Sequence, residues 1–187
     1  MRAFAEIANR IQKAIKAGAP HSAEAVRMIV AGGAAQHFYT AARVSVDIDA
    51  TLSKRMMLPP DLDVPFLDAD GSPRVLYFDR QYNDTFALLH EDADTDSRPL
   101  ALPGIDANVL DVRLLAPVDL AVSKISRFAE HDQADIAALA RAGLIDTASV
   151  RARAEDARGG YIGDMKRIAN SIGLACKLIE KSQRPLT

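Results

Sequence analysis

The chain has 187 residues, of which 49% are hydrophobic and 26% are charged, and its formal net charge is −2. This composition is ordinary for a globular protein, and the chain is long enough to bury a core without disulfides. No run of about eighteen apolar residues is present, so we expect no transmembrane helix. The near-neutral charge provides no global basic field that would indicate a nucleic-acid-binding protein.

The first segment predicts an amphipathic helix over residues 3–17, ended by Gly18, because its apolar residues recur at helical spacing. Charged residues interrupt it throughout, so it lacks the apolar core of a signal peptide. Ser22 is placed to cap a short second helix. The single cysteine, Cys176, is expected to be packed within a helix, which fits a cytoplasmic protein.

The middle of the chain alternates strand and turn patterns. An apolar run at 27–30 predicts a buried strand, and Gly32-Gly33 turns the chain into a helix over residues 34–42. An acidic loop is expected over residues 91–97. Further strands are predicted at residues 44–51, 64–67, 75–78, 85–90 and 110–115.

From Pro117 onward the pattern is helical, and proline suits the first position of a helix. Helices are predicted at 117–129, at 131–142, from a cap at Asp146 to Gly159-Gly160, and at 163–181. Helices around a small mixed sheet, followed by a helical tail, predict an α+β (mixed α/β) fold. We expect a core over residues 1–116 and a C-terminal helical region over 117–187 packed on it.

Two acids in the predicted strand at 44–51 carry the strongest chemical signal. Asp47 and Asp49 alternate with apolar residues, so both side chains project from one face of the strand. Acids are poor strand formers and would repel each other unless a cation or hydrogen bonds offset their charge. We therefore predict a divalent metal site, Mg²⁺ or Mn²⁺, at these two residues. The alternative is an edge strand whose acids face solvent.

The spacing of Gly32-Gly33 and Asp47-Ile48-Asp49 resembles the nucleotidyltransferase superfamily, whose signature is a Gly-Gly or Gly-Ser pair followed by Asp-x-Asp or Asp-x-Glu. A second segment, beginning at Pro117-Val118-Asp119-Leu120, resembles that of AbiEii-type bacterial nucleotidyltransferases. Its further matching residues are Lys124, Arg127, Asp132 and Asp135.

The resemblance implies roles for particular residues. Gly32 and Gly33 would seat the phosphates of a nucleoside triphosphate such as ATP, Asp47 and Asp49 would hold the metal, and Lys124 would lie near the triphosphate. Arg127 and Arg43 are further candidates for nucleotide binding. The alternatives are a salt-bridged helical hairpin for Lys124 and Arg127, which share a helical face, and a structural ion pair for Arg43.

The superfamily usually supplies a third carboxylate from a later antiparallel strand. In this sequence the predicted strand at 85–90 has no acid in its middle. If this strand continues to residue 92, Asp92 stands at its end, and we predict Asp92 as the third catalytic acid. Glu91 is the alternative acid, and His90 is an alternative base.

The resemblance implies transfer of a nucleoside monophosphate to a hydroxyl of RNA, such as the 3′ end of tRNA, or of a partner protein. It also implies a bacterial toxin–antitoxin or phage-defence setting, with a cognate toxin or antitoxin as a possible partner. The alternative is a non-catalytic nucleotide-binding or protein-interaction module of the same fold. The candidate RNA-facing residues are Arg151, Arg153, Arg158, Lys166, Arg167 and Lys177, although a solvated helical face is the competing interpretation.

Overall fold

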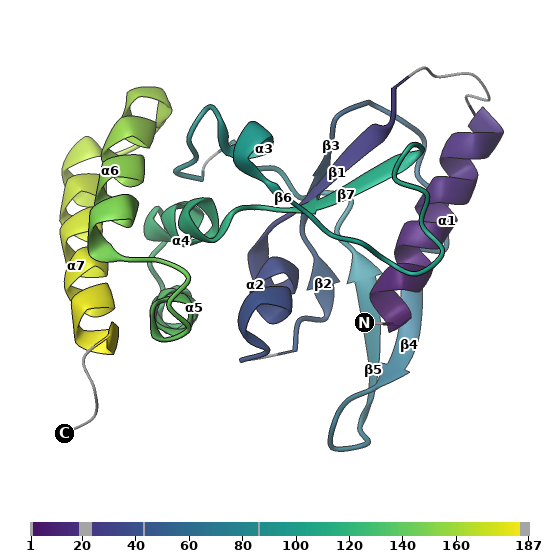
Figure 1. The fold of residues 1–187 in the computed structure, drawn as a ribbon, viewed down its shortest axis with the longest axis horizontal. Helices are drawn as coiled ribbons and strands as arrows, with labels where there is room; N and C mark the ends of the chain where they lie inside the picture. Colours follow the sequence, from purple (N-terminus) through teal and green to yellow (C-terminus); the bar gives the residue numbers. More distant parts are fainter. Residues whose placement is uncertain (1, 19–23, 43, 86, 184–187) are drawn as a thin grey trace. The chain divides into compact units, whose positions relative to one another are not determined.

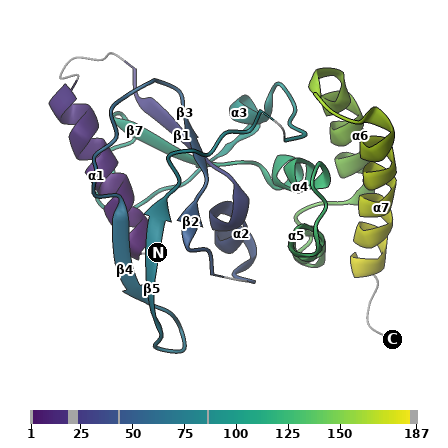
Figure 2. The same cartoon turned by 180° about the vertical axis from the view of Figure 1, so that it is seen from behind.

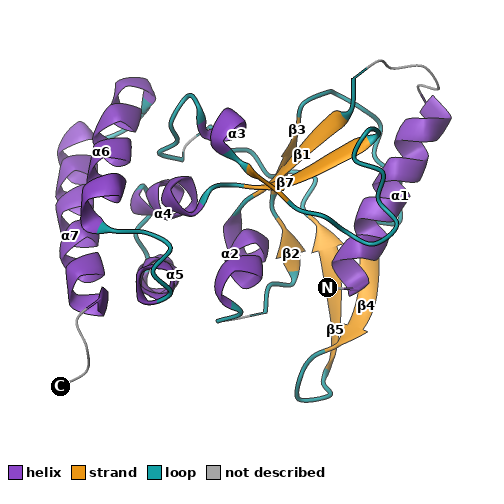
Figure 3. Cartoon of the chain, viewed as in Figure 1, coloured by secondary structure: helices purple, strands orange, loops and turns teal. Residues whose placement is uncertain are grey.

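The computed structural model describes residues 2–18, 24–42, 44–85 and 87–183. The chain forms two compact units. The sheet unit comprises residues 1–35, 44–82 and 97–114, and the helical unit comprises residues 36–43, 83–96 and 115–187. All strands of the described residues belong to the sheet unit, while most helices belong to the helical unit (Figures 1 and 3). This mixed composition confirms the predicted α+β class.

The larger sheet of the sheet unit has four strands in the order β3-β1-β7-β6. The strand β1 pairs in parallel with β7 and antiparallel with β3, and β6 pairs antiparallel with β7. The interior of β1 is almost wholly apolar, as expected for a strand buried on both faces. The strands are β1 (Val26–Val30), β3 (Ala50–Leu52), β6 (Arg98–Pro99) and β7 (Leu110–Leu114).

The smaller sheet has the order β2-β5-β4. Its strands are β2 (Asp47–Ile48), β4 (Asp63–Leu67) and β5 (Pro73–Phe78). The single strand predicted at 44–51 is wrong, because the chain leaves one sheet and enters the other at Asp49. The strand β2 pairs with β5 in the smaller sheet, whereas β3 pairs with β1 in the larger one. Asp49 therefore lies at the junction of the two sheets.

The helix α1 (Arg2–Gly18) covers the smaller sheet, as Figure 2 shows for β4 and β5. Its apolar stripe is buried at every expected position, namely Phe4, Ile7, Ile11 and Ile15. The buried Gln12 donates to the carbonyl of Gly104 and accepts from the amide of Asp106, which satisfies its polar side chain. The predicted N-terminal amphipathic helix is confirmed.

The C-terminal part of the helical unit is built from four consecutive helices, α4 to α7, and a short 3-10 turn. Asp146 caps α6 by accepting a hydrogen bond from the amide of Ser149 at 2.9 Å, as predicted. The apolar faces of the four helices form one core that includes Leu120, Ile136, Val150 and Ile172. The elements are α4 (Pro117–Ile125), α5 (Glu130–Arg141), α6 (Thr147–Ala157), η1 (Arg158–Gly160) and α7 (Met165–Gln183).

Other predicted elements meet different outcomes. The helix after the glycine pair is present as α2 (Gly32–Thr40). The predicted strand at 85–90 is wrong, since none of its described residues is in a strand. The predicted acidic loop contains a short helix, α3 (Ala93–Asp96). The residues 19–23, which include the Ser22 cap, lie outside the described part of the chain, and Glu24 and Ala25 are not helical.

Candidate active site

Asp47 and Asp49 lie on one side of the chain where it passes between the two sheets. Both are half-buried, whereas Ile48 and Ala50 between and after them are buried at 0% and 6% exposure. The Ser45 hydroxyl donates a hydrogen bond to Asp47 Oδ1 at 2.6 Å. The alternation of burial therefore turns both carboxylates away from the core, as the spacing of the two acids predicts.

Gly32 lies directly against the carboxylate of Asp49. A Cβ atom built on Gly32 would lie 1.9 Å from Asp49 Oδ2, and the φ angle of Gly32 is +56°. The adjoining Ala31 amide donates to the carbonyl of Asp49 at 2.8 Å. Only glycine meets both demands, since it has no Cβ and tolerates positive φ. The glycine thus brings the start of α2 against this acid, where the positive end of the helix dipole favours negative charge.

A third acid, Asp79, follows the neighbouring strand β5 on the same side of the smaller sheet. The strands β2 and β5 run parallel with Asp47 opposite Tyr77 and Ile48 opposite Phe78. Asp79 follows directly, and its amide donates to the carbonyl of Ile48 at 3.0 Å. The side chain of Asp79 is half-buried, and its Oδ1 accepts from the amide of Gln81. Asp79 therefore continues the ladder at the level of Asp49.

Tyr77 reports the electrostatics of this cluster. Its pKa is raised above the ordinary value, first by the charge of Asp47, then by burial, and further by the charges of Asp79 and Asp49. The phenol consequently keeps its proton and remains a hydrogen-bond donor beside the three carboxylates. We refer to Asp47, Asp49 and Asp79, with Tyr77, as the acid face of the smaller sheet.

The acid face fits a hard divalent cation that is completed by a substrate. Carboxylate oxygens are the ligands that Mg²⁺ prefers, and Mg²⁺ is usually held by one or two carboxylates together with substrate phosphates. No group of three or more His, Cys, Asp or Glu side chains in the described residues is arranged to hold a metal on its own. A cation held by Asp47 and Asp49 would therefore need further ligands, such as the oxygens of a bound triphosphate.

Asp92, the predicted third acid, has different surroundings. It belongs to the helical unit, where its side chain is 63% exposed and its carboxylate lies 3.9 Å from Nδ1 of His90. The amide of Asp92 donates to that same nitrogen, so Nε2 of His90 donates to Asp156 Oδ2 at 2.9 Å. A catalytic role for Asp92, Glu91 or His90 stays a prediction. The acid that joins Asp47 and Asp49 in the sheet unit is Asp79.

Sequence reasoning missed Asp79 although a signal was present. The strand at 75–78 was predicted, and alternation along it places Val75, Tyr77 and Asp79 on one face. The acid stands one residue beyond the strand, in the same position relative to β5 as Asp49 relative to β2. The third acid was instead sought in the run at 85–90, because the resemblance implies that it lies on a later antiparallel strand.

Lys124 and Asp135 form an ion pair inside the helical unit. Lys124 Nζ lies 2.8 Å from Asp135 Oδ2, and the two side chains are only 6% and 3% exposed. The pair joins α4 to α5, which is the geometry of the salt-bridged hairpin that the spacing also allowed. A role for Lys124 at a triphosphate stays a prediction, and it requires the ammonium to leave this buried carboxylate.

Arg127 and Asp132 form a second link between the same helices. The guanidinium binds both carboxylate oxygens at 2.7 Å, and Asp132 Oδ2 accepts from the amide of Ala129 at the start of α5. Burial tends to raise the pKa of Asp132, but the hydrogen bonds from Arg127 and Ala129 outweigh burial and lower it. A nucleotide-binding role for Arg127 likewise stays a prediction.

Arg153 was a candidate for contact with RNA, but the structure uses it differently. Its guanidinium binds both oxygens of the fully buried Asp119, at 2.7 and 3.0 Å, and also binds Asp96 at 2.7 Å. Its side chain is 16% exposed. The hydrogen bonds with Asp119 raise its pKa above the ordinary value for arginine. Asp119 of the second motif thus holds α6 against α4.

The remaining candidates are placed as follows. Cys176 is buried, as expected, and burial raises its pKa. Gly33 is buried at the start of α2, and its phosphate-binding role stays a prediction. Arg43 lies outside the described residues.

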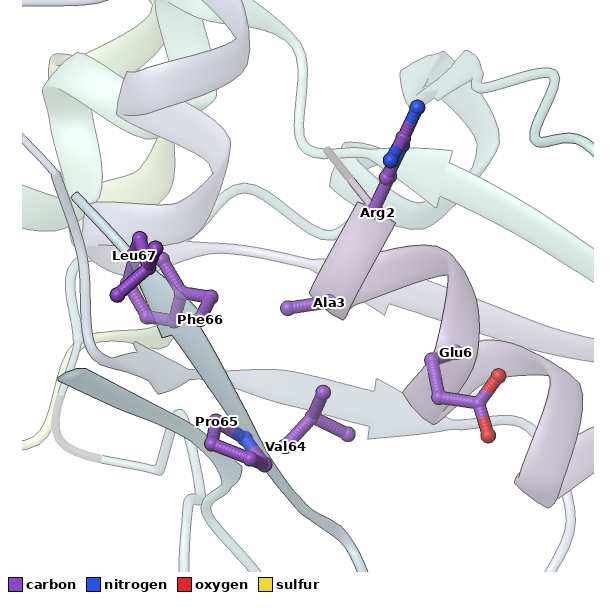
Figure 4. Close-up of a pocket in the computed structure, with 7 residues that line it drawn as sticks. All are labelled: Arg2, Ala3, Glu6, Val64, Pro65, Phe66 and Leu67. Atoms are coloured by element: carbon purple, nitrogen blue, oxygen red, sulfur yellow. The ribbon is translucent and has the colours of Figure 1, made fainter. Parts of the chain in front are cut away.

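A hollow of about 560 Å³ lies between the start of α1 and β4, and Figure 4 shows its lining. None of the predicted site residues borders it. Its lining combines apolar side chains with one arginine and one glutamate, which does not resemble a triphosphate site. The residues are Arg2, Ala3, Glu6, Val64, Pro65, Phe66 and Leu67.

Comparison with known proteins gives one match. A family model described as "Nucleotidyltransferase of unknown function (DUF6036)" matches residues 6–184, nearly the whole chain. No curated protein and no solved structure matches significantly. In the described part of the chain, every helix is too short or too polar to cross a bilayer.

Proposed function

The chain belongs to the DUF6036 family of nucleotidyltransferases, and we propose that it transfers a nucleoside monophosphate from a triphosphate to a hydroxyl, with Mg²⁺ or Mn²⁺ bound at the acid face. The observation that carries the proposal is the convergence of Asp47, Asp49 and Asp79 around Tyr77. A structural explanation for three half-buried carboxylates on one face would need compensating charge. Bound Mg²⁺ or Mn²⁺ would supply it.

In this proposal Asp47 and Asp49 hold the metal, which when bound neutralises phosphate charge and makes the acceptor hydroxyl more acidic. The acceptor oxygen attacks the α-phosphorus, the bond to the β-phosphate oxygen breaks, and pyrophosphate leaves. Asp79 takes the proton of the acceptor hydroxyl. Tyr77, which keeps its own proton, donates a hydrogen bond to an oxygen of the reacting groups.

Gly32 and Gly33 are proposed to face the phosphates. The first residues of a helix carry amides without intrahelical partners, and these bind anions well. Gly32 also fixes Asp49, because the carboxylate fills the space that a side chain would occupy. Lys124, Arg127 and Arg43 are proposed as additional charges for the triphosphate on the resemblance alone.

The acceptor and the cellular setting are proposed more broadly. On resemblance, the acceptor is an RNA, such as the 3′ end of tRNA, or a protein hydroxyl, and the setting is a cytoplasmic toxin–antitoxin or phage-defence system. The alternative of a non-catalytic module depended on a missing third acid. We propose that Asp79 supplies that acid, and we therefore favour the catalytic function over the non-catalytic one.

The test is incubation of the purified protein with each α-³²P-labelled triphosphate, Mg²⁺ and a cell extract of RNA and protein. Label transferred to a macromolecule with Mg²⁺, and absent with EDTA, is the expected result. Asp47→Asn should abolish transfer while leaving the circular dichroism spectrum and the melting temperature nearly unchanged, because Asp47 is half-buried and an asparagine oxygen can still accept the hydrogen bond from the Ser45 hydroxyl. Undiminished transfer by Asp47→Asn would show that the acid face is not the catalytic site.

A further inference from the structure

The last helix, α7, has two contrasting sides. One side is buried in the helical unit and is formed by Ile168, Ile172, Ala175 and Ile179. The opposite side is exposed and carries Lys166, Lys177 and Lys181. With about 100° between successive residues, these three lysines fall within about 60° of arc and extend over about 22 Å of helix. We call them the α7 lysine stripe.

The lysine stripe differs from several arginines of the helical unit, whose positive charge is balanced by ion pairs. Arg127, Arg153 and Arg158 each form an ion pair with an aspartate or a glutamate. Among the described residues, no ion pair involves Lys166, Lys177 or Lys181. The only acid within α7 is Glu180. The exposed side of the helix is therefore locally cationic although the whole chain has a net charge of −2.

The stripe ends at a hollow of about 900 Å³ between α5 and α7. Two cations, Arg141 and Lys181, border the hollow, and apolar Ala137, Ala140 and Leu178 also line it. A cation beside an apolar surface suits a phosphate joined to a base and sugar. The volume lies within the range of small-molecule sites, so it can take one nucleotide.

We propose that the α7 lysine stripe binds the phosphate backbone of a polynucleotide, with one nucleotide seated in the hollow beside Arg141, and that this polynucleotide is the acceptor of the transfer reaction. Charge complementarity is the reason, because a row of exposed lysines leading to a hollow matches a chain of phosphates better than it matches a neutral or mixed-charge protein surface. The assignment of this polynucleotide as the acceptor rests on the proposed function. The binding of a polynucleotide to the lysine stripe does not depend on the transfer reaction.

The experiment measures binding of the full chain to three fluorescent probes by anisotropy: a 20-nucleotide unstructured RNA, the DNA of the same sequence, and total tRNA. The variant K166Q/K177Q/K181Q removes the stripe. The control K13Q/K16Q/R55Q removes three exposed charges from the sheet unit, so both variants have the same net charge. All six positions are exposed, so both variants should fold normally.

Loss of three phosphate contacts should make the negative slope of log K against log salt shallower by about 2, which corresponds to a loss of affinity on the order of fiftyfold at 0.15 M salt. The control should bind like the unchanged protein. Equal loss in both variants, unchanged binding by the stripe variant, or no binding of any probe by the unchanged protein would overturn the proposal. Tighter binding of RNA or tRNA than of DNA identifies the source of the polynucleotide.

A transfer assay then separates the two proposals. If the stripe variant loses labelling of RNA but still binds labelled triphosphate with Mg²⁺, the acceptor assignment is supported. If the unchanged protein binds polynucleotide through the stripe yet transfers no label, the proposed catalytic function fails and the binding surface stands. If label appears in protein rather than nucleic acid, and stripe removal does not change it, the acceptor assignment is overturned while the catalytic function stands.

Discussion

Replacing Gly32 with alanine should disable the acid face while leaving the fold in place. The new Cβ would lie 1.9 Å from Asp49 Oδ2, whereas ordinary contacts begin near 3.4 Å, so the carboxylate oxygen must move by about 1.5 Å. A displacement of about 1 Å in a reacting group costs about 100-fold in rate. We therefore expect Gly32→Ala to lower the transfer rate at least about 100-fold.

The same substitution also carries a backbone cost, since Gly32 has a φ of +56°. Alanine in the left-handed region costs about 1–2 kcal/mol, which lowers the melting temperature by only a few degrees. Gly104→Ala is the matched control, because Gly104 has a φ of +78° and a Cβ atom added there would meet nothing within 4 Å. It should show a similar loss of stability and normal activity.

Label transfer and thermal melting of both variants test whether Gly32 positions Asp49. If it does, the two variants lose similar stability and only Gly32→Ala loses activity. Normal transfer by Gly32→Ala would refute the claim that this glycine positions Asp49. Equal loss of activity in both variants would show that backbone strain, rather than displacement of the carboxylate, is responsible.

Two further predictions concern the ion pairs of the helical unit. Lys124→Met should destabilise the unit by about 3–5 kcal/mol in urea denaturation, because it removes the ammonium that lies 2.8 Å from the buried carboxylate of Asp135, and the double variant with Asp135→Leu should recover most of this loss. A Lys124→Met variant of full stability would contradict the pair's structural role. The lowered pKa of Asp132 predicts stability that is fully present above the unfolded pKa of about 3.9 and is lost as pH falls through the folded value. Asp132→Asn should flatten this acid limb of the stability curve, and an unchanged limb would show that another group causes it.

The local part of this fold could be predicted from the sequence. The helix α1 and the C-terminal helices follow from the spacing of their apolar residues, and the cap of α6 follows from Asp146. These features depend on residues within a few turns of one another. The orientation of Asp47 and Asp49 was equally accessible, because alternation along an extended chain is a local property.

The features that were missed depend on contacts distant in sequence. The chain changes sheets at Asp49 because the residues before it, β2, pair with β5, whereas the residues after it, β3, pair with β1. The position of Asp79 beside Asp49 follows only from the register of β5 with β2, which the sequence does not reveal. The run at 85–90 was apolar enough for a strand, yet Leu88 is buried although it does not belong to a strand. The sequence pattern of Arg153 is that of an exposed residue, and its pairing with the buried Asp119 depends on how α6 packs against α4.

The most direct test of the account compares the initial rate of label transfer in three single variants: Asp47→Asn, Asp79→Asn and Asp92→Asn. Asp47→Asn and Asp79→Asn should each lower the rate of transfer by about 100-fold or more while keeping the fold, because each removes a carboxylate from the acid face. Asp92→Asn should transfer label at the normal rate. Normal transfer by Asp79→Asn together with its loss in Asp92→Asn would contradict the assignment of the third acid and, with it, the proposed catalytic site.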